Sequence, residues 1–295
     1  MERELWKILY HLAVSLDRRC GVLERWTDAE IVVVYLWAVL NDRPVLWACQ
    51  ARNWPGGLWP KARLPSQSTM SRRLRTAEVR ALLDQMAQYL QRFWPRMGWV
   101  RIVDSKPLVL GSHSKDPDSA WGRAGKAYAR GYKIVAIYGQ SPLPEAWDVV
   151  PLNQADSETT LGLLPRIARG GYLVGDCQLD SNPLYDACWE KGCQLVAKRK
   201  RPKGGLGHRR HSPARLRSIG LLQTEFGKAL YAVRGEIERQ FAWLTNHGGG
   251  LMPLPNWVRR QERVRLWVQA KLMVHAVYVY HSRDRPALIA GGKAA

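Results

Sequence analysis

Two aspartates, far apart in the chain, stand where a carboxylate could take part in chemistry. Asp104 follows the β-branched run WVRIV and Asp176 follows GYLVG, so each is predicted to lie at the end of a strand. Sites in α/β folds gather at such strand ends. If the two strands are neighbours, the carboxylates lie side by side and raise each other's pKa unless a cation neutralises them. Two hard oxygen ligands suit Mg²⁺ or Mn²⁺.

A third candidate, Glu238, lies in a stretch that is predicted to be helical. At about 100° per residue, Tyr231, Arg234 and Glu238 fall within roughly a 60° arc of that helix. Glu236 lies on nearly the opposite face. Glu238 therefore shares a stripe with a phenol hydroxyl and a guanidinium group. Taken alone, a carboxylate beside arginine on a helix is more often an ion pair than a metal ligand.

The elements that would position these residues alternate along the chain. After Pro95 we expect three strands (WVRIVDS, GYKIVAIYG, AWDVVPLN), a helix capped by Asp156 or Ser157, the strand GYLVGDC, a helix around Pro183 to Lys191, the strand QLVAKRK, a long helix from about Gln223 to Leu244, and an amphipathic helix over 257–282. This order predicts an α/β fold, a ribonuclease-H-like mixed sheet with flanking helices.

Residues 1–95 are predicted to form a small all-α domain ahead of that sheet. Thr27 and Glu30 form a capping box before the apolar run 31–40. Two helices, a loop and a short polar helix are similar to a helix-turn-helix variant. The side chains of the short helix that could reach base edges and phosphates are Gln67, Ser68, Thr69, Arg72 and Arg73. The alternative is a solvated helix in an all-α cap.

The composition narrows the class of partner. The 295 residues contain 45 Lys and Arg against 25 Asp and Glu, a net charge of +20, which favours a polyanion and most often nucleic acid. A generally basic proteome is the alternative explanation. Five cysteines with no CxxC pair argue against a disulfide framework or a zinc site. No apolar run approaches the ~20 residues of a membrane-spanning helix, so no membrane partner is expected. No secretory signal is visible.

Two basic segments accompany the predicted sheet. The first, residues 111–133, is expected to be a loop that tracks the DNA backbone or a solvated connector; its candidate contacts are Lys115, Arg123 and Lys126. Trp121 within it could stack on an unpaired base. The second, residues 197–217, carries nine Lys or Arg and no acid, which favours salt-sensitive backbone binding. Its candidate contacts are Lys198, Arg199, Lys200, Arg201, Arg209 and Arg210.

Taken together, these motifs resemble the DDE transposases of bacterial insertion sequences, in the group with a Tyr-x2-Arg-x3-Glu signature. The matching segments are VDSKPL, KIVAIYG, GDCQLDSNPLY, and Tyr231, Arg234 and Glu238 followed by RQFAWL. The resemblance covers roughly residues 98–282. The signature usually places a Lys seven residues beyond the Glu. Here that position is Thr245, so this DNA contact of the family is not carried over.

The resemblance implies that Asp104, Asp176 and Glu238 hold two divalent ions, Mg²⁺ or Mn²⁺, for in-line displacement at phosphodiesters. It implies a transposase that cuts the ends of an insertion sequence and joins them to target DNA. It also implies double-stranded DNA as partner, a homodimer on that DNA, and a place in the bacterial cytoplasm at the nucleoid. Two alternatives stay open: a nuclease of the same fold that does not join strands, and a non-catalytic DNA-binding protein derived from a transposase.

The residues around the predicted trio each have a functional and a structural interpretation. Arg234 is placed to clamp a phosphate, with a core ion pair as the alternative, and Tyr231 and Lys106 could contact phosphates or support the core. Asp180 is expected to cap the helix after Asp176, outside the metal site. The predicted domains are a helical DNA-end-binding domain over 1–95, a ribonuclease-H-like catalytic domain over 96–282 and a flexible tail over 283–295.

Overall fold

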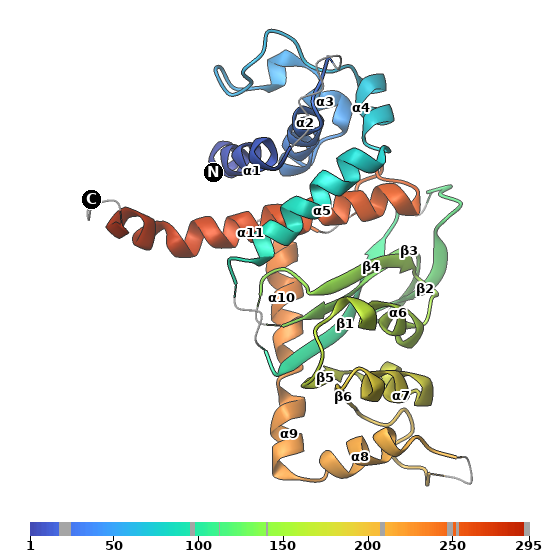
Figure 1. Ribbon diagram of the computed structural model, residues 1–295. Helices are drawn as coiled ribbons and strands as arrows, with labels where there is room; N and C mark the ends of the chain where they lie inside the picture. Colours follow the sequence, from blue (N-terminus) through green and yellow to red (C-terminus); the bar gives the residue numbers. More distant parts are fainter. Residues whose placement is uncertain are drawn as a thin grey trace. The chain divides into compact units, whose positions relative to one another are not determined.

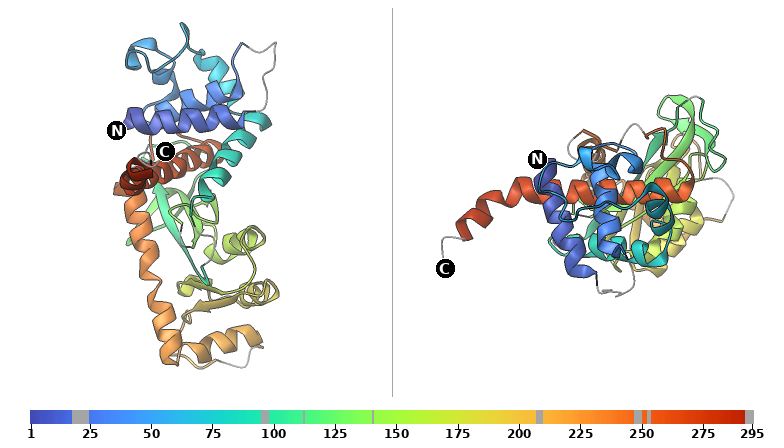
Figure 2. Two further views of the ribbon diagram at one scale, coloured as in Figure 1. Left: turned by 60° about the vertical axis from the view of Figure 1, so that its left-hand side comes forward. Right: turned by 90° about the horizontal axis from the view of Figure 1, so that it is seen from above.

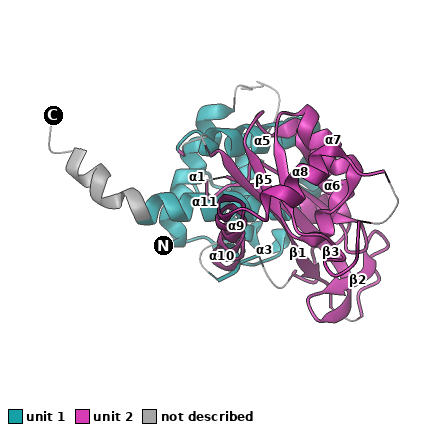
Figure 3. Ribbon diagram, turned by 90° about the horizontal axis from the view of Figure 1, so that it is seen from below, with its two compact units in different colours: residues 1–93, 244–251, 266–295 teal, residues 94–243, 252–265 magenta. Residues whose placement is uncertain are grey.

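The computed structural model describes residues 1–17, 25–94, 98–111, 113–139, 141–206, 210–246, 250–251 and 254–291, with side chains up to residue 282. The chain divides into two compact units (Figure 3). The first contains residues 1–93, 244–251 and 266–295, and the second contains residues 94–243 and 252–265. No described helix is long and apolar enough to cross a membrane.

The first unit is helical, as predicted for the N-terminal region (Figure 1). Its elements are α1 (Glu2–Leu16), α2 (Asp28–Leu40), α3 (Val45–Ala48), the 3-10 turn η1 (Ala51–Asn53), α4 (Gln67–Arg73), α5 (Ala77–Gln91) and most of α11 (Gln261–Gly291). The predicted capping box is confirmed: Thr27 Oγ1 accepts from the Glu30 amide, and the Glu30 carboxylate accepts from the Thr27 amide. Since α2 is buried all round, it forms the centre of this unit.

The second unit is built on a six-stranded mixed sheet of β1 (Val100–Val109), β2 (Ala120–Ala124), β3 (Ala127–Tyr138), β4 (Ala146–Pro151), β5 (Tyr172–Gly175) and β6 (Gln194–Ala197). The strand order is β2-β3-β1-β5-β6, with β4 paired to β3 as well. Neighbours among β1, β3 and β4 are antiparallel, whereas β5 and β6 run parallel to β1. This is the ribonuclease-H-like mixed sheet that was predicted.

Helices cover both faces of this sheet (Figure 2). They are α6 (Asp156–Leu163), α7 (Asn182–Glu190), α8 (Pro213–Leu221), α9 (Glu225–Ala232) and α10 (Gly235–Asn246), with the 3-10 turns η2 (Leu164–Arg166) and η3 (Cys177–Leu179). Leu173 of β5 packs in one core cluster with residues of α6 and α7. Its neighbour Val174 packs in another cluster with Leu230 of α9. Successive strand residues point to opposite faces, so the two clusters lie on opposite sides of the sheet.

Two elements differ from the sequence-based expectation. The predicted single helix over 223–244 is broken at Val233 and Arg234, where the Arg234 amide bonds the Tyr231 carbonyl in a tight turn. The predicted basic loop over 111–133 instead contains β2 and the first half of β3. A hairpin forms there because Gly125, at φ 65°, takes the left-handed conformation that the turn requires. At the other end of the chain, α11 runs to Gly291, beyond its predicted end at Ser282.

Candidate active site

Asp104 lies within β1, and Asp176 directly follows the neighbouring strand β5. Both lie at the same distance along the chain from the last pair of residues that joins the two strands. The parallel ladder between β1 and β5 ends with Ile102 opposite Val174, and each aspartate comes two residues later. The register therefore sets the two carboxylates side by side. The prediction that β1 ends at Asp104 is wrong, because β1 continues to Val109 against β3. β5, by contrast, ends at Gly175, directly before Asp176.

The surroundings of the two aspartates disfavour their ionised forms. The pKa of Asp104 is raised to about 6, first by burial and further by the charges of Asp176 and Asp156. The Ser105 amide, 2.8 Å from the Asp104 carboxylate, and the Arg234 guanidinium oppose this rise. Burial also raises the pKa of Asp176. Because ionisation of these two acids is unfavourable, a bound cation would stabilise their carboxylate forms.

Arg234 lies between Asp104 and Glu238. Its Nη2 atom is 4.0 Å from Asp104 Oδ2 and 3.8 Å from Glu238 Oε1, so these two oxygens are less than about 8 Å apart. The Glu238 side chain is 67% exposed and its charge faces Arg234. Glu236, by contrast, pairs with Arg239. Among the residues with described coordinates, no three His, Cys, Asp or Glu are grouped closely enough to hold a metal ion.

A tyrosine and two lysines surround the aspartates. The Tyr231 ring packs on β5 and β6, with Lys198 Nζ 4.7 Å from its centroid. Burial raises the pKa of Tyr231, and the charges of Asp176 and Asp104 add to this effect. Lys106 lies on the same side of β1 as Asp104, with its Nζ 6.0 Å from the Phe241 ring of α10. Burial lowers the pKa of Lys106.

Asp156 is a further carboxylate near the site, and the only role predicted for it was that of a helix cap, with Ser157 as the alternative. That assignment is wrong: the N-cap of α6 is Ala155, and neither Asp156 nor Ser157 caps the helix. The Asp156 carboxylate instead accepts from Ser105 Oγ at 2.8 Å and pairs with Lys133 of β3. Its charge raises the pKa of both Asp104 and Asp176. The sequence did contain a signal for this pair: Lys133 lies within the otherwise apolar run 132–138, and a buried lysine needs an acidic partner.

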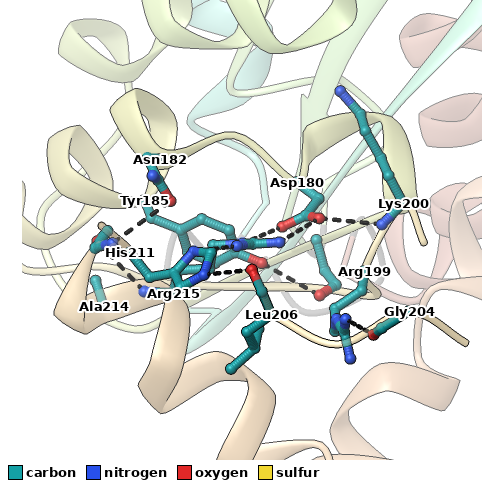
Figure 4. Close-up of polar contacts among 12 residues, drawn as sticks. Asp180, Asn182, Tyr185, Arg199, Lys200, Gly204, Leu206, His211, Ala214 and Arg215 are labelled. Atoms are coloured by element: carbon teal, nitrogen blue, oxygen red, sulfur yellow. Dashed lines mark hydrogen bonds and ion pairs between the residues drawn. The ribbon is translucent and has the colours of Figure 1, made fainter. Parts of the chain in front are cut away.

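Asp180 organises the second basic segment (Figure 4). Arg215 donates from Nε (2.6 Å) and Nη2 (2.9 Å) to its two oxygens, and the Lys200 amide donates at 3.0 Å. Arg215 Nη1 lies 2.7 Å from His211 Nδ1, and His211 Nε2 lies 2.7 Å from the Leu206 carbonyl oxygen. The capping role predicted for Asp180 is therefore wrong, because both of its oxygens are bound elsewhere. The N-cap of α7 is Ser181.

The predicted contacts of the two basic segments are mostly open to solvent. Exposed side chains in the described residues are Lys115, Arg123, Lys126, Lys198, Lys200, Arg201 and Arg210. The positive charge of Lys200 lowers the pKa of Asp176, so this lysine lies near the aspartates. Arg199 is half-buried and bonds the carbonyls of Gly204 and Gly205. Arg209 lies outside the described residues.

In the first unit, the predicted DNA-contacting helix is α4, and Ser66 caps it by accepting from the Thr69 amide. A cavity of about 430 Å³ beside it is lined by Arg25, Trp26, Leu64, Ser66, Thr69, Arg72 and Arg73. Gln67 and Arg72 are exposed. Arg73 is held inside the unit by Asp28 (2.7 Å) and the Trp26 carbonyl (3.1 Å), so it links α4 to α2. The role of α4 in DNA binding remains a prediction.

The sheet order and the paired aspartates define a class, that of ribonuclease-H-like proteins with an acidic site where β1 and β5 diverge. The family model for the transposase DDE domain matches residues 95–275. The chain belongs to this family of transposase domains. No curated protein and no solved structure matches the chain.

Proposed function

We propose that this protein is a DNA transposase that cuts the ends of an insertion sequence and joins them to target DNA. The observation that carries the proposal is the β1–β5 register, whose last pair lies two residues before both Asp104 and Asp176, in a chain of the transposase DDE domain family. The net charge of +20 supports a DNA substrate. Two element ends have to be held together, so we expect a homodimer on double-stranded DNA of the nucleoid.

We assign the metal site to Asp104, Asp176 and Glu238. The two aspartates fit a divalent cation, because they are adjacent oxygen donors whose pKa values are raised by burial and, to a smaller extent, by the charges of neighbouring acids. Glu238 would complete the set from the first turn of α10, by turning its exposed side chain from Arg234 towards Asp104. A bound pair of Mg²⁺ or Mn²⁺ ions supplies activation of the attacking oxygen and stabilisation of the leaving oxygen.

Around that site the basic and phenolic groups would hold the DNA strand. At 4.0 and 3.8 Å, Arg234 is in ion-pair range of Asp104 and Glu238 but beyond hydrogen-bond distance, so its guanidinium is available to a phosphate oxygen. Lys106, Lys198 and Lys200 would add positive charge on either side of the aspartates. The Tyr231 hydroxyl, near both aspartates, would donate to a phosphate.

The test incubates the protein with Mg²⁺, a DNA fragment that carries the inverted repeats flanking its gene, and a target plasmid. Joined product supports the transposase, cut ends alone support a nuclease, and retention without cleavage supports a non-catalytic DNA-binding protein. Asp104→Asn and Asp176→Asn should reduce cleavage to background while DNA retention persists. Retained cleavage would remove these aspartates from the site.

Glu236 provides a matched control for Glu238. Both residues are exposed on the first turn of α10 and both face an arginine, but Glu236 pairs with Arg239. Glu238→Gln should therefore abolish cleavage, whereas Glu236→Gln should leave the rate nearly unchanged. Equal losses in the two variants would contradict the assignment of Glu238 as a metal ligand.

A further inference from the structure

The hairpin of β2 and the first half of β3 has two chemically different faces. The register sets Trp121 opposite Arg130 and Arg123 opposite Tyr128. Side chains alternate along a strand, so these four residues share one face. The other face carries only small residues, namely Ala120, Gly122, Ala124, Ala127 and Ala129.

The small-residue face is the one that lies against the rest of the second unit. A Cβ atom on Gly122 would come within 2.7 Å of the Leu152 carbonyl oxygen, so the backbone passes too close there for a side chain. The face with Trp121 and Tyr128 is therefore the outer one. Figure 3 shows β2 at the edge of the second unit.

The two aromatic side chains on the outer face are open to solvent. Trp121 is 55% exposed and Tyr128 is 68% exposed. Their rings are nearly parallel, with centroids 6.0 Å apart and planes at 12°. A cross-strand aromatic pair stabilises a hairpin, which explains why the rings meet. It does not explain why so much of both rings remains exposed to water.

Positive charge accompanies the aromatic pair. Residues 119–133 contain four Lys or Arg and no acid, and of these four Lys133 is buried and paired with Asp156. Arg130 is used within the fold, where it donates to Ser119 Oγ and to the carbonyls of Ser114 and Asp116. Arg123 and Lys126 are exposed. The hairpin thus combines stacked rings on its outer face with two exposed cations, Arg123 on the same face and Lys126 in the turn, the combination that binds single-stranded nucleic acid.

We propose that Trp121 and Tyr128 form a stacking platform for unpaired bases of a DNA strand, with Arg123 and Lys126 on its phosphates. The proposal rests on the proposed function in taking DNA as the ligand. The absence of acid from 119–133 favours a polyanion over a protein partner. The platform would hold a strand whose bases are unpaired, because a duplex hides the ring faces on which stacking depends.

The experiment measures binding by fluorescence anisotropy, in EDTA, of a short labelled single strand and of the duplex of the same sequence. Trp121→Ala should weaken single-strand binding by between about 5-fold and about 150-fold, the range for loss of one stacked base. Tyr128→Leu, which keeps bulk but loses the ring, should act in the same direction. Duplex affinity should change little, and Trp121→Phe should retain most of the single-strand affinity.

Trp99→Ala is the matched control, since Trp99 is 75% exposed in the same unit but lies outside the hairpin. Thermal melting establishes that each variant is folded; if Trp121→Ala is not, Tyr128→Leu and Trp121→Phe decide. Unchanged single-strand binding in a folded Tyr128→Leu protein would overturn the platform, as would equal losses on single strand and duplex. Failure of the transposase proposal would appear separately, as absence of cleavage with Mg²⁺ while single-strand binding persists.

Discussion

At Asp104, several interactions act on one carboxyl group. Burial and the charges of Asp176 and Asp156 favour the protonated acid, while Arg234 and the Ser105 amide favour the carboxylate. Burial has the largest effect of these interactions, and the pKa of Asp104 is therefore raised to about 6. In the absence of a cation, the ionised site therefore reduces the stability of the fold near neutral pH.

This balance predicts a pH-dependent effect of Asp104→Asn. The folded-state pKa of about 6 lies above the ordinary aspartate pKa of 3.8, so the folded protein holds the proton more tightly than the unfolded chain does. The contribution of Asp104 to stability is complete below about pH 4 and is lost as the pH rises through about 6. At about pH 8 the variant should be more stable than wild type by up to about 3 kcal/mol.

Urea unfolding of both proteins without divalent ions, at about pH 8 and about pH 4, measures this difference. The advantage of the Asn variant should shrink towards the lower pH. A gap of the same size at both pH values would show that the substitution acts through packing rather than through the charge of Asp104.

The sequence was sufficient to predict that the two aspartates lie side by side in the sheet, because each directly follows a run of apolar residues. It was not sufficient for Asp156, whose position ahead of a helix suggested only a cap. The contact of Asp156 with Ser105 and Lys133 joins three elements that are distant in the chain. Nor could helical periodicity determine which way the exposed Glu238 side chain turns.

Among the elements, the segment from β6 to α8 shows how a strongly basic stretch is held in place. Asp180 follows Asp176 by four residues and binds both Arg215 of α8 and the Lys200 amide. A guanidinium that donates two hydrogen bonds to one carboxylate forms a strong, directional pair. The segment that carries Lys198 and Lys200 is thus fixed to the same turn that carries Asp176.

Asp180→Asn should loosen this segment. The Asp180 side chain is almost fully buried, and removing one partner of a buried pair costs about 3 kcal/mol. Trypsin should cut between Lys198 and Arg210 several-fold faster than in wild type, as followed by mass spectrometry of the fragments. Asp148→Asn, which removes the partner of Arg265 in the same unit, is the control and should leave this cleavage unchanged. Equal protection in the Asp180 variant would mean that Arg215 does not hold the segment.

Prediction of the elements succeeded where periodicity was regular and failed where glycine decided the outcome. The three long strands alternate clearly between apolar and polar residues or are wholly apolar. The hairpin was predicted as a loop, because its glycines Gly122, Gly125 and Gly131 look like breakers. The end of α9 was missed, although Gly235 directly after Arg234 was a signal that the helix could break there.

On the scale of the whole molecule, the net charge of +20 determines how the protein would meet DNA. Contacts between Lys or Arg and phosphates release counterions, so affinity falls as salt rises. Composition alone indicates this class of partner. It does not indicate that residues 266–295 belong to the first unit, because the periodicity of an amphipathic helix does not specify what its apolar face packs against.

Salt dependence therefore separates the charged contacts from the stacking contacts. For duplex DNA, the slope of log K against log salt should become shallower by up to about 0.9 for each phosphate contact removed. We expect a change approaching about 1.8 for the double variant Lys200→Ala with Arg201→Ala. Lys228→Ala, which removes a lysine already paired with Glu225, should leave the slope unchanged. An unaltered slope in the double variant would exclude these two side chains from the backbone contacts.

The short ladder between β1 and β5 makes the chain unequally tolerant of insertions and deletions. Only three residue pairs join these strands, and each aspartate lies two residues beyond the last of these pairs. Loss of one residue between Val174 and Asp176 would turn the carboxylate to the opposite face, and would be as damaging as loss of the acid itself. The hairpin of β2 and β3 can change in length without altering this two-residue spacing. Variation in length during evolution is therefore expected in the hairpin and not beside the aspartates.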